Sequence, residues 1–212
     1  MNRLLIATRS PDKAREIKEI LEAHKAGVEA VSLEDARVAW SSAEDRLEEF
    51  DSFQSNARSK AEYFAKLTGL PTVADDSGLE VLSLLGQPGV RSKRFAPNAA
   101  NLAGEELDAA NNAELLRRLL GAEGKRRRAS YTCVAVLLRR PAAAATDFTG
   151  RVWGRILEEP QGEGGFGYDP LFFHEESGKT FAELTAEEKH AVSHRGEAFR
   201  QVAEALAARG VG

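Results

Sequence analysis

Short apolar runs of strand length alternate along this chain with longer segments whose apolar residues recur at helical spacing. Alternation of this kind, without a strict repeating unit, is typical of α/β proteins, so we expect a mixed sheet covered by helices. The strand-like runs cover residues 3–8, 71–74, 129–140 and 146–157, and the helix-like segments cover 10–24, 52–69, 101–121 and two stretches within 185–210. Ser52 is the expected N-cap of the segment 52–69, and Thr185 with Glu188 has the spacing of a capping box.

The composition favours a folded interior and excludes several classes of partner. The chain has 212 residues, of which 42% are hydrophobic, enough for one large domain or two small lobes. A net charge of −4 gives no overall positive field for a long nucleic acid. No apolar run suits a signal peptide or a membrane span, so we expect no membrane partner and a cytoplasmic location. The single cysteine, Cys133, excludes an internal disulfide and is expected in the core.

The stretch ATRSPDK joins the first strand-like run to the first helix-like segment. Ser10 is predicted as the helix N-cap with Pro11 at the first helical position, so unpaired backbone N–H groups at this turn favour an anion. Lys13, in the first turn, adds positive charge. The stretch lacks the glycines and the GK[ST] of a P-loop, so an ordinary capped helix is an equally good interpretation.

Two adjacent acids, Asp75 and Asp76, follow the run 71–74 and precede Ser77 and a glycine. Neighbouring carboxylates repel each other and are costly to bury, so we expect a cation beside them where the strand ends. Their oxygens suit Mg²⁺ carrying phosphates, and one acid could also accept a proton from an attacking water. The alternative is a turn in which one Asp is a cap and the other is solvated.

Two further stretches combine polar and flat side chains. Asn56 and Lys60 lie four residues apart on one helix and would suit a triphosphate, although a solvated helix edge explains them as well. In GGFGYDP, glycines surround Phe166 and Tyr168, which could form a slot for a flat base, with Asp169 reading its polar edge. The alternative is a flexible hairpin loop whose aromatic rings pack on the core.

The stretch SHRGEAF places His194 and Arg195 in the first turn of the last helix, where the helix dipole disfavours cations. Such a cost often marks a site, and either side chain could donate a hydrogen bond to a carbonyl oxygen on a base. The alternative is that both are solvated. The basic run 124–130 lacks interleaved aromatic residues and is interpreted as a solvated connection.

Four motifs taken together resemble the inosine triphosphate pyrophosphatase family: SFQSNARSKA, ADDSGLEVLSLLGQPGVRSKRFA, GEGGFGYDPLFF and TFAELTAEEKHAVSHR. The resemblance runs from about Leu4 to the last helix. It implies a single domain over 1–212 with an elongated, two-lobed α/β fold, a long curved mixed sheet flanked by helices, and an active-site cleft between the lobes. A homodimer is also implied.

The same resemblance implies hydrolysis of the purine nucleoside triphosphates dITP, ITP and XTP to the monophosphate and pyrophosphate, with Mg²⁺ as cofactor. Asp76 resembles the metal ligand and proton acceptor, with Asp75 beside it, and Glu48 resembles a further metal ligand, although Glu49 is an alternative. Ser77 matches a substrate contact. Lys13 and Lys60 resemble the phosphate-binding lysines. The positions that match base recognition are Phe166, Gly167, Tyr168, Asp169, Lys189, His194 and Arg195.

The first loop departs from the family pattern. Thr8, Arg9 and Ser10 stand where the family usually has Thr-Gly-Asn, so close approach of the backbone to a phosphate is less assured there. This loop also resembles that of Maf-type nucleotide pyrophosphatases, which act on other modified nucleotides. A Maf-like pyrophosphatase and a non-catalytic nucleotide-sensing module therefore stay open as alternatives.

Overall fold

The computed structural model describes residues 2–209, and the chain divides into two compact units. The first unit comprises Met1–Asp76, Cys133–Gly150 and His194–Gly212. The second comprises Ser77–Thr132 and Arg151–Ser193. Both units draw on segments that are distant in the sequence, so neither could be recognised as one continuous stretch.

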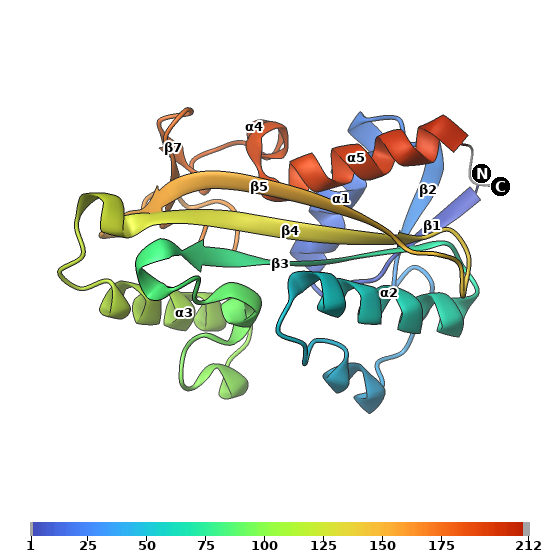
Figure 1. Cartoon of the computed structure of the whole chain (residues 1–212), viewed down its shortest axis with the longest axis horizontal. Coiled ribbons are helices and arrows are strands. Elements are labelled where there is room, and N and C mark those ends of the chain that lie inside the picture. The colour runs from blue at the N-terminus through green and yellow to red at the C-terminus, as the bar shows by residue number, and fades with distance from the viewer. Residues whose placement is uncertain (1, 210–212) are drawn as a thin grey trace. The chain divides into compact units, whose positions relative to one another are not determined.

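The structure confirms an α/β fold built on a mixed seven-stranded sheet with the order β2-β1-β3-β4-β5-β6-β7 (Figure 1). Strand β1 pairs in parallel with β2 and β3, whereas β6 pairs antiparallel with β5 and β7. The strands are β1 (Asn2–Ile6), β2 (Val28–Ser32), β3 (Thr72–Val81), β4 (Arg128–Leu138), β5 (Thr146–Ile156), β6 (Phe172–His174) and β7 (Lys179–Thr180).

In the first unit, α1 (Pro11–Ala23) and α5 (His194–Arg209) cover one face of the sheet and α2 (Phe53–Thr68) covers the other (Figure 1). Alternate strand residues point to opposite faces. Leu4, Ile6 and Val73 therefore join the core beneath α1 and α5, whereas Leu5 and Ala74 join the core beneath α2. This alternation decides where the next two residues of β3 point.

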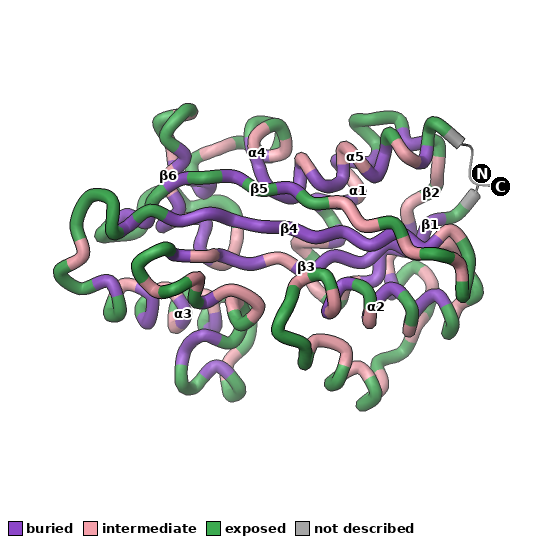
Figure 2. The backbone as a smooth tube through the Cα atoms, in the orientation of Figure 1, coloured by how far each residue is buried: buried purple, intermediate pink, exposed green. Residues whose placement is uncertain are grey.

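The second unit contains α3 (Gly104–Arg118) and α4 (Ala186–Val192). Its core includes the rings of Tyr131, Phe172 and Phe181, and the ring centroids of Phe172 and Phe181 lie 4.9 Å apart. Strand β4 is buried along nearly its whole length (Figure 2), which fits its continuous apolar run over residues 133–138. The short 3₁₀ segments are η1 (Ser42–Arg46), η2 (Leu82–Leu84), η3 (Gly89–Arg94), η4 (Ala99–Asn101) and η5 (Gly124–Arg127).

Several local predictions are confirmed. Ser10 caps α1 with Pro11 at its start, Ser52 caps α2, and Thr185 forms a capping box with Glu188 at the start of α4. These caps depend on residues within one turn of each other, which is why the sequence reveals them. No helix among residues 2–209 combines the length and apolar character needed to span a bilayer.

Two predictions were wrong. Strand β3 does not end before the acidic pair but runs through Asp75 and Asp76 to Val81, because neighbouring helices supply partners for both buried carboxylates. The basic run 124–130 is not wholly solvated. Arg127 is buried and donates hydrogen bonds to the carbonyl oxygens of Ile156 and Leu157, at 2.7 and 2.6 Å.

Candidate active site

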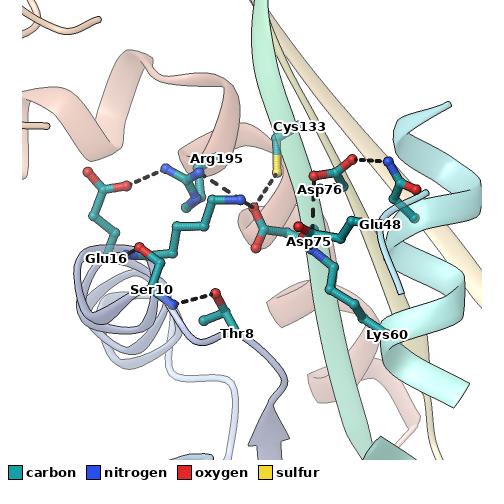
Figure 3. A network of polar contacts seen from close by, with 11 residues as sticks. Thr8, Ser10, Glu16, Glu48, Lys60, Asp75, Asp76, Cys133 and Arg195 are labelled. Atoms are coloured by element: carbon teal, nitrogen blue, oxygen red, sulfur yellow. Dashed lines mark hydrogen bonds and ion pairs between the residues drawn. The ribbon is translucent and has the colours of Figure 1, made fainter. Parts of the chain in front are cut away.

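Asp75 lies on the face of β3 that α1 and α5 cover, and its side chain is fully buried (Figure 3). The Oδ2 atom of Asp75 lies 3.2 Å from Lys13 Nζ and 3.4 Å from Arg195 Nη2. Arg195 also donates from Nη1 to Glu16 Oε2 at 2.6 Å. Two cations and two carboxylates thus form a buried network, in which Cys133 Sγ lies 3.9 Å from Asp75 Oδ2.

Opposing effects determine the charge of this network. Burial raises the pKa of Asp75, but Lys13, Arg195 and Lys60 outweigh it and hold the pKa below the usual carboxyl range. Burial lowers the pKa of Arg195, whereas Glu16 and Asp75 raise it further than burial lowers it. Asp75 is therefore an ionised anchor for two cations.

Asp76 points to the opposite face, toward α2, and is also buried. Its Oδ2 atom accepts a hydrogen bond of 2.9 Å from Asn56 Nδ2, and its Oδ1 atom lies 3.9 Å from Lys60 Nζ. Asn56 Oδ1 in turn accepts from the backbone N–H of Phe50 at 2.9 Å. The amide therefore ties Asp76 to the acidic segment that precedes α2.

Lys60 connects three oxygen atoms. Its Nζ atom donates to Glu48 Oε1 and to the carbonyl oxygen of Asp75, each at 2.5 Å, in addition to the longer contact with Asp76. Burial raises the pKa of Asp76, and the nearby Glu48 carboxylate adds to this, although Lys60 and Lys13 oppose it. Burial lowers the pKa of Lys60, but Glu48, Asp76 and Asp75 raise it above its usual value. Asp76 consequently binds a proton more readily than an ordinary aspartate.

The residues at this position fit a magnesium ion through their donor chemistry. Asp76 and Glu48 both approach Lys60, and all their donor atoms are carboxylate oxygens, which Mg²⁺ prefers. The part of the chain that the structure describes contains no group of three or more His, Cys, Asp or Glu side chains suited to a metal. The protein would thus supply few ligands, as is usual for Mg²⁺ that retains waters and binds substrate phosphates. Asp75 instead points toward Lys13 and Arg195.

The loop before α1 arranges its polar groups locally. The Ser10 backbone N–H donates to Thr8 Oγ1 at 3.2 Å, and Ser10 Oγ accepts from the Lys13 backbone N–H at 3.4 Å. Arg9 is exposed, and its guanidinium donates to both oxygens of Glu44, at 2.8 and 2.7 Å. Arg9 also donates to the carbonyl oxygens of residues 38 and 39. The contacts of Arg9 thus join the loop to residues 38–44.

The glycine-rich loop belongs to the second unit. Asp169 Oδ2 accepts from Lys189 Nζ at 2.6 Å and from the Phe166 backbone N–H at 2.9 Å, and Lys189 Nζ lies 4.7 Å from the centroid of the Phe166 ring. Tyr168 is buried, and its hydroxyl donates to the Ser92 carbonyl oxygen. The structure thus groups Phe166, Asp169 and Lys189, while Tyr168 packs in the core.

Helix α3 holds the same loop at Gly167. The Gly167 N–H donates to Asp108 Oδ2 at 2.7 Å, and the Gly167 carbonyl oxygen accepts from Asn112 Nδ2 at 2.9 Å. Gly167 adopts a φ of 64°, a left-handed conformation that glycine reaches without strain. Its two backbone groups are therefore fixed by one helix.

Comparison with known proteins identifies the family. The sequence model of the Ham1 family matches residues 4–205. The dITP/XTP pyrophosphatase of Thermus thermophilus is 45% identical over 203 residues, which cover 96% of this chain and 91% of that protein. The dITP/XTP pyrophosphatase of Geobacter sulfurreducens is 42% identical over 211 residues and covers 100% of both chains. The chain belongs to the Ham1 family.

Solved structures agree with this assignment to the Ham1 family. A HAM1 protein from Coxiella burnetii matches with a TM-score of 0.82 and 34% identity, covering 98% of this chain and 100% of that chain. A nucleoside-triphosphatase described as a dITP/XTP pyrophosphatase from Mycobacterium abscessus matches with a TM-score of 0.67 and 39% identity, covering 97% of each chain. The family resemblance and the fold class expected from the motifs are both confirmed.

The remaining residues that the family resemblance assigns to the site differ from one another in burial and in their partners. His194 is buried at the start of α5, next to Arg195. Ser77 is half-buried and begins the second unit's part of β3. Of the two candidate acids, the half-buried Glu48 pairs with Lys60, whereas Glu49 is exposed. Their assigned roles in binding substrate or metal stay predictions.

Sequence reasoning missed Glu16, which anchors Arg195. A sequence signal for a buried ion pair was present, since Glu16 is a carboxylate on the apolar face of α1. It is buried together with Ala14 and Ile17. An acid on a buried face requires a cationic partner, although the sequence does not say which one. That partner lies 179 residues further along the chain.

Proposed function

We propose that this Ham1 chain is a Mg²⁺-dependent pyrophosphatase that converts dITP, ITP and XTP to the nucleoside monophosphate and pyrophosphate. The observation that carries the proposal is the surroundings of Asp76. A buried carboxylate with a raised pKa sits between the amide of Asn56 and the ammonium of Lys60. Relatives at 45% and 42% identity are named dITP/XTP pyrophosphatases.

In the proposed reaction Asp76 accepts a proton from the attacking water at Oδ1, the oxygen that Asn56 does not engage. The bond from water oxygen to the α-phosphorus forms while the bond from the α-phosphorus to the bridging oxygen breaks, and pyrophosphate leaves. Asn56 fixes the orientation of the carboxylate. Burial makes Asp76 a stronger base than an exposed aspartate would be.

The positive charge needed around the phosphates comes from Lys60 and Lys13, with backbone N–H groups at the start of α1 adding to it. Lys60 is held by Glu48 and Lys13 by Asp75, so neither ammonium needs to reorganise before the reaction. Magnesium, held by Asp76 and Glu48, would neutralise charge on the phosphate oxygens.

We propose that base selectivity depends on donors that meet the 6-keto group of hypoxanthine or xanthine. Candidate donors are the residues that the family resemblance assigns to base recognition, His194, Arg195 and Lys189, and the resemblance assigns Phe166 as a ring for stacking. Adenine presents an amino donor at this position, and two opposed donors would leave buried groups unpaired. ITP should therefore exceed ATP by at least about 100-fold in kcat/KM.

Pyrophosphate release from a panel of triphosphates tests the proposal. Wild-type protein with Mg²⁺ should hydrolyse ITP, dITP and XTP and should spare ATP, and chelation of the metal should abolish turnover while the far-UV circular dichroism stays unchanged. Asp45→Asn is the matched control for Asp76→Asn, because Asp45 is an exposed acid three residues before Glu48. Binding of ITP without release would support a sensing module, and preference for modified pyrimidine triphosphates would support a Maf-like enzyme.

We also propose a cytoplasmic homodimer, as the family resemblance implies. Sedimentation equilibrium of the full chain across a concentration series tests the oligomeric state, and a monomer at all concentrations would contradict it.

A further inference from the structure

A pocket of about 650 Å³ in the first unit lies apart from the Asp75–Asp76 network and shares no lining residue with it. Its walls come from the segment 36–41 that follows β2, from the C-terminal half of α2, and from β1. The pocket is open to solvent, and its volume lies within the range of pockets that bind small organic molecules. The proposed catalytic role leaves this pocket unexplained.

Two guanidinium groups line this pocket. Arg3 comes from β1 and Arg37 from the turn after β2, and both residues are exposed. Among residues 2–209, neither of these side chains makes a hydrogen bond or an ion pair. Arg9, by comparison, pairs with Glu44. The pocket therefore offers two planar cations whose hydrogen-bonding capacity is not used within residues 2–209, and such groups match the oxygen atoms of a phosphate.

The backbone at Arg37 adds an independent observation. Arg37 has a φ of 55°, in a turn closed by hydrogen bonds from its own N–H to the Glu34 carbonyl oxygen and from the Val38 N–H to the Leu33 carbonyl oxygen. A glycine would adopt this left-handed conformation without strain, whereas a long side chain adopts it at a cost. Strain of this kind is found disproportionately at ligand sites.

The rest of the pocket lining is aromatic and aliphatic. Trp40 lines the pocket and is 63% exposed, an unusual state for the largest apolar side chain. Tyr63 and the 55% exposed Leu67 of α2 line it as well. An exposed indole beside aliphatic groups provides a surface on which a flat base can stack.

We propose that this pocket, lined by Arg3, Arg37, Trp40, Tyr63 and Leu67, is a second nucleotide site, in which a base stacks on Trp40 and its phosphates bind Arg3 and Arg37. The charge favours a small anion over a second copy of this chain, because two unpaired guanidiniums at a protein interface would need acids opposite them. A nucleoside diphosphate combines the flat ring and the phosphate oxygens that the lining can bind.

Arg9 connects this pocket with the loop before α1. Its guanidinium donates to the carbonyl oxygens of Val38 and Ala39, which both line the pocket, at 2.9 and 3.1 Å. Its backbone belongs to the loop that precedes Lys13, whose Nζ atom lies 3.2 Å from Asp75. A ligand that moves residues 38–41 therefore also moves the loop before α1. We expect such a ligand to change the KM for ITP. This expectation rests on the proposed function.

Tryptophan fluorescence tests the binding directly. The chain contains two tryptophans, so Trp153→Phe leaves Trp40 as the only reporter. In this background, ADP should quench the emission saturably, whereas adenosine and inorganic phosphate, each lacking half of the ligand, should bind at least about 10-fold more weakly. ADP is chosen because the proposed active site disfavours adenine. The titration needs no turnover, so its result is independent of the proposed reaction.

Variants separate this pocket from the active site. Arg37→Gln should weaken ADP binding at least about 10-fold while ITP hydrolysis without ADP stays unchanged. Arg37→Gly should weaken binding equally and also raise the melting temperature, because it removes the strained conformation. Lys25→Gln is the matched control, since Lys25 is exposed and has a φ of 50° but does not line the pocket.

Three results would overturn the assignment. Quenching by ADP that survives both Arg37 variants would place the nucleotide elsewhere, and absence of saturable quenching would exclude this nucleotide site. A change of Trp40 emission that follows protein concentration instead of ADP would show that a second copy covers the pocket. If ADP binds as expected but leaves the KM for ITP unchanged, the coupling through Arg9 is wrong.

Discussion

Replacing each of the two neighbouring aspartates by asparagine should give opposite results. Asp75→Asn removes a fully buried negative charge that lies within 3.4 Å of both Lys13 and Arg195. Removal of one partner from a buried ion pair typically costs about 3–5 kcal/mol, because a buried charge remains uncompensated. For a chain of this length, that corresponds to a melting temperature lower by about 6–20 °C.

Asp76→Asn should instead cost no more than about 1.5 kcal/mol of stability, because a typical intramolecular hydrogen bond contributes about 0.5–1.5 kcal/mol net and most contacts remain. Lys60 keeps Glu48 and the carbonyl oxygen of Asp75, and the new amide can still accept from Asn56. Burial already disfavours the charge of Asp76. Turnover, however, should fall at least about 100-fold, as expected when a general base is lost.

Differential scanning calorimetry and pyrophosphate release, measured on the same preparations, distinguish these outcomes. Equal losses of stability in the two variants would refute the division between a structural and a catalytic acid. The pH dependence provides a second check. The pKa of Asp75 is lowered in the fold, so its stabilisation is present above about pH 4, the unfolded value, and is lost as the pH falls toward the folded pKa. Asp75→Asn should remove this acid-side loss.

Two further predictions concern the titration of Asp76 without metal and the position of α5. Because burial raises the pKa of Asp76, an NMR titration of its carboxyl group in Mg²⁺-free protein should give a midpoint above the ordinary aspartate value of about 3.9, and a midpoint below it would argue against Asp76 as the base. A Cβ at Gly150 would lie 2.0 Å from the His194 carbonyl oxygen, so Gly150→Ala should displace the first turn of α5 with Arg195, cost about 1–3 kcal/mol and lower kcat/KM. Gly154→Ala, whose Cβ would meet the Phe173 carbonyl oxygen at 2.4 Å, should destabilise the fold while sparing the kinetics at a permissive temperature, and equal kinetic losses in both variants would contradict the role of α5.

Features that depend on nearby residues could be predicted from the sequence. The caps at Ser10, Ser52 and Thr185 are local, and the alternation of apolar runs was sufficient for the α/β class. From the sequence, Asn56, Lys60 and Asp76 were all assigned to one triphosphate-binding site, and the structure places the side chains of Asn56 and Lys60 beside that of Asp76.

Features that depend on distant partners could not be predicted. Asp75 stays inside a strand because Arg195, which is 120 residues away in the chain, reaches it from α5. Glu44 was not singled out, although it binds the guanidinium of Arg9 across 35 residues. Arg127 belongs to a run that looks solvated, yet it pairs with carbonyl oxygens near the end of β5. In each case the tertiary partner, and not the local pattern, decides whether a charge can be buried.

The placement of the two acids on successive residues of one strand has a consequence for how this strand can change. A shift of β3 by a single residue would exchange the faces of all its side chains. Asp75 would then turn toward α2 and Asp76 toward α1 and α5, so the anchor and the base would each meet the wrong set of cations. Insertions or deletions between Val73 and Asp76 should consequently be far less tolerated than substitutions there.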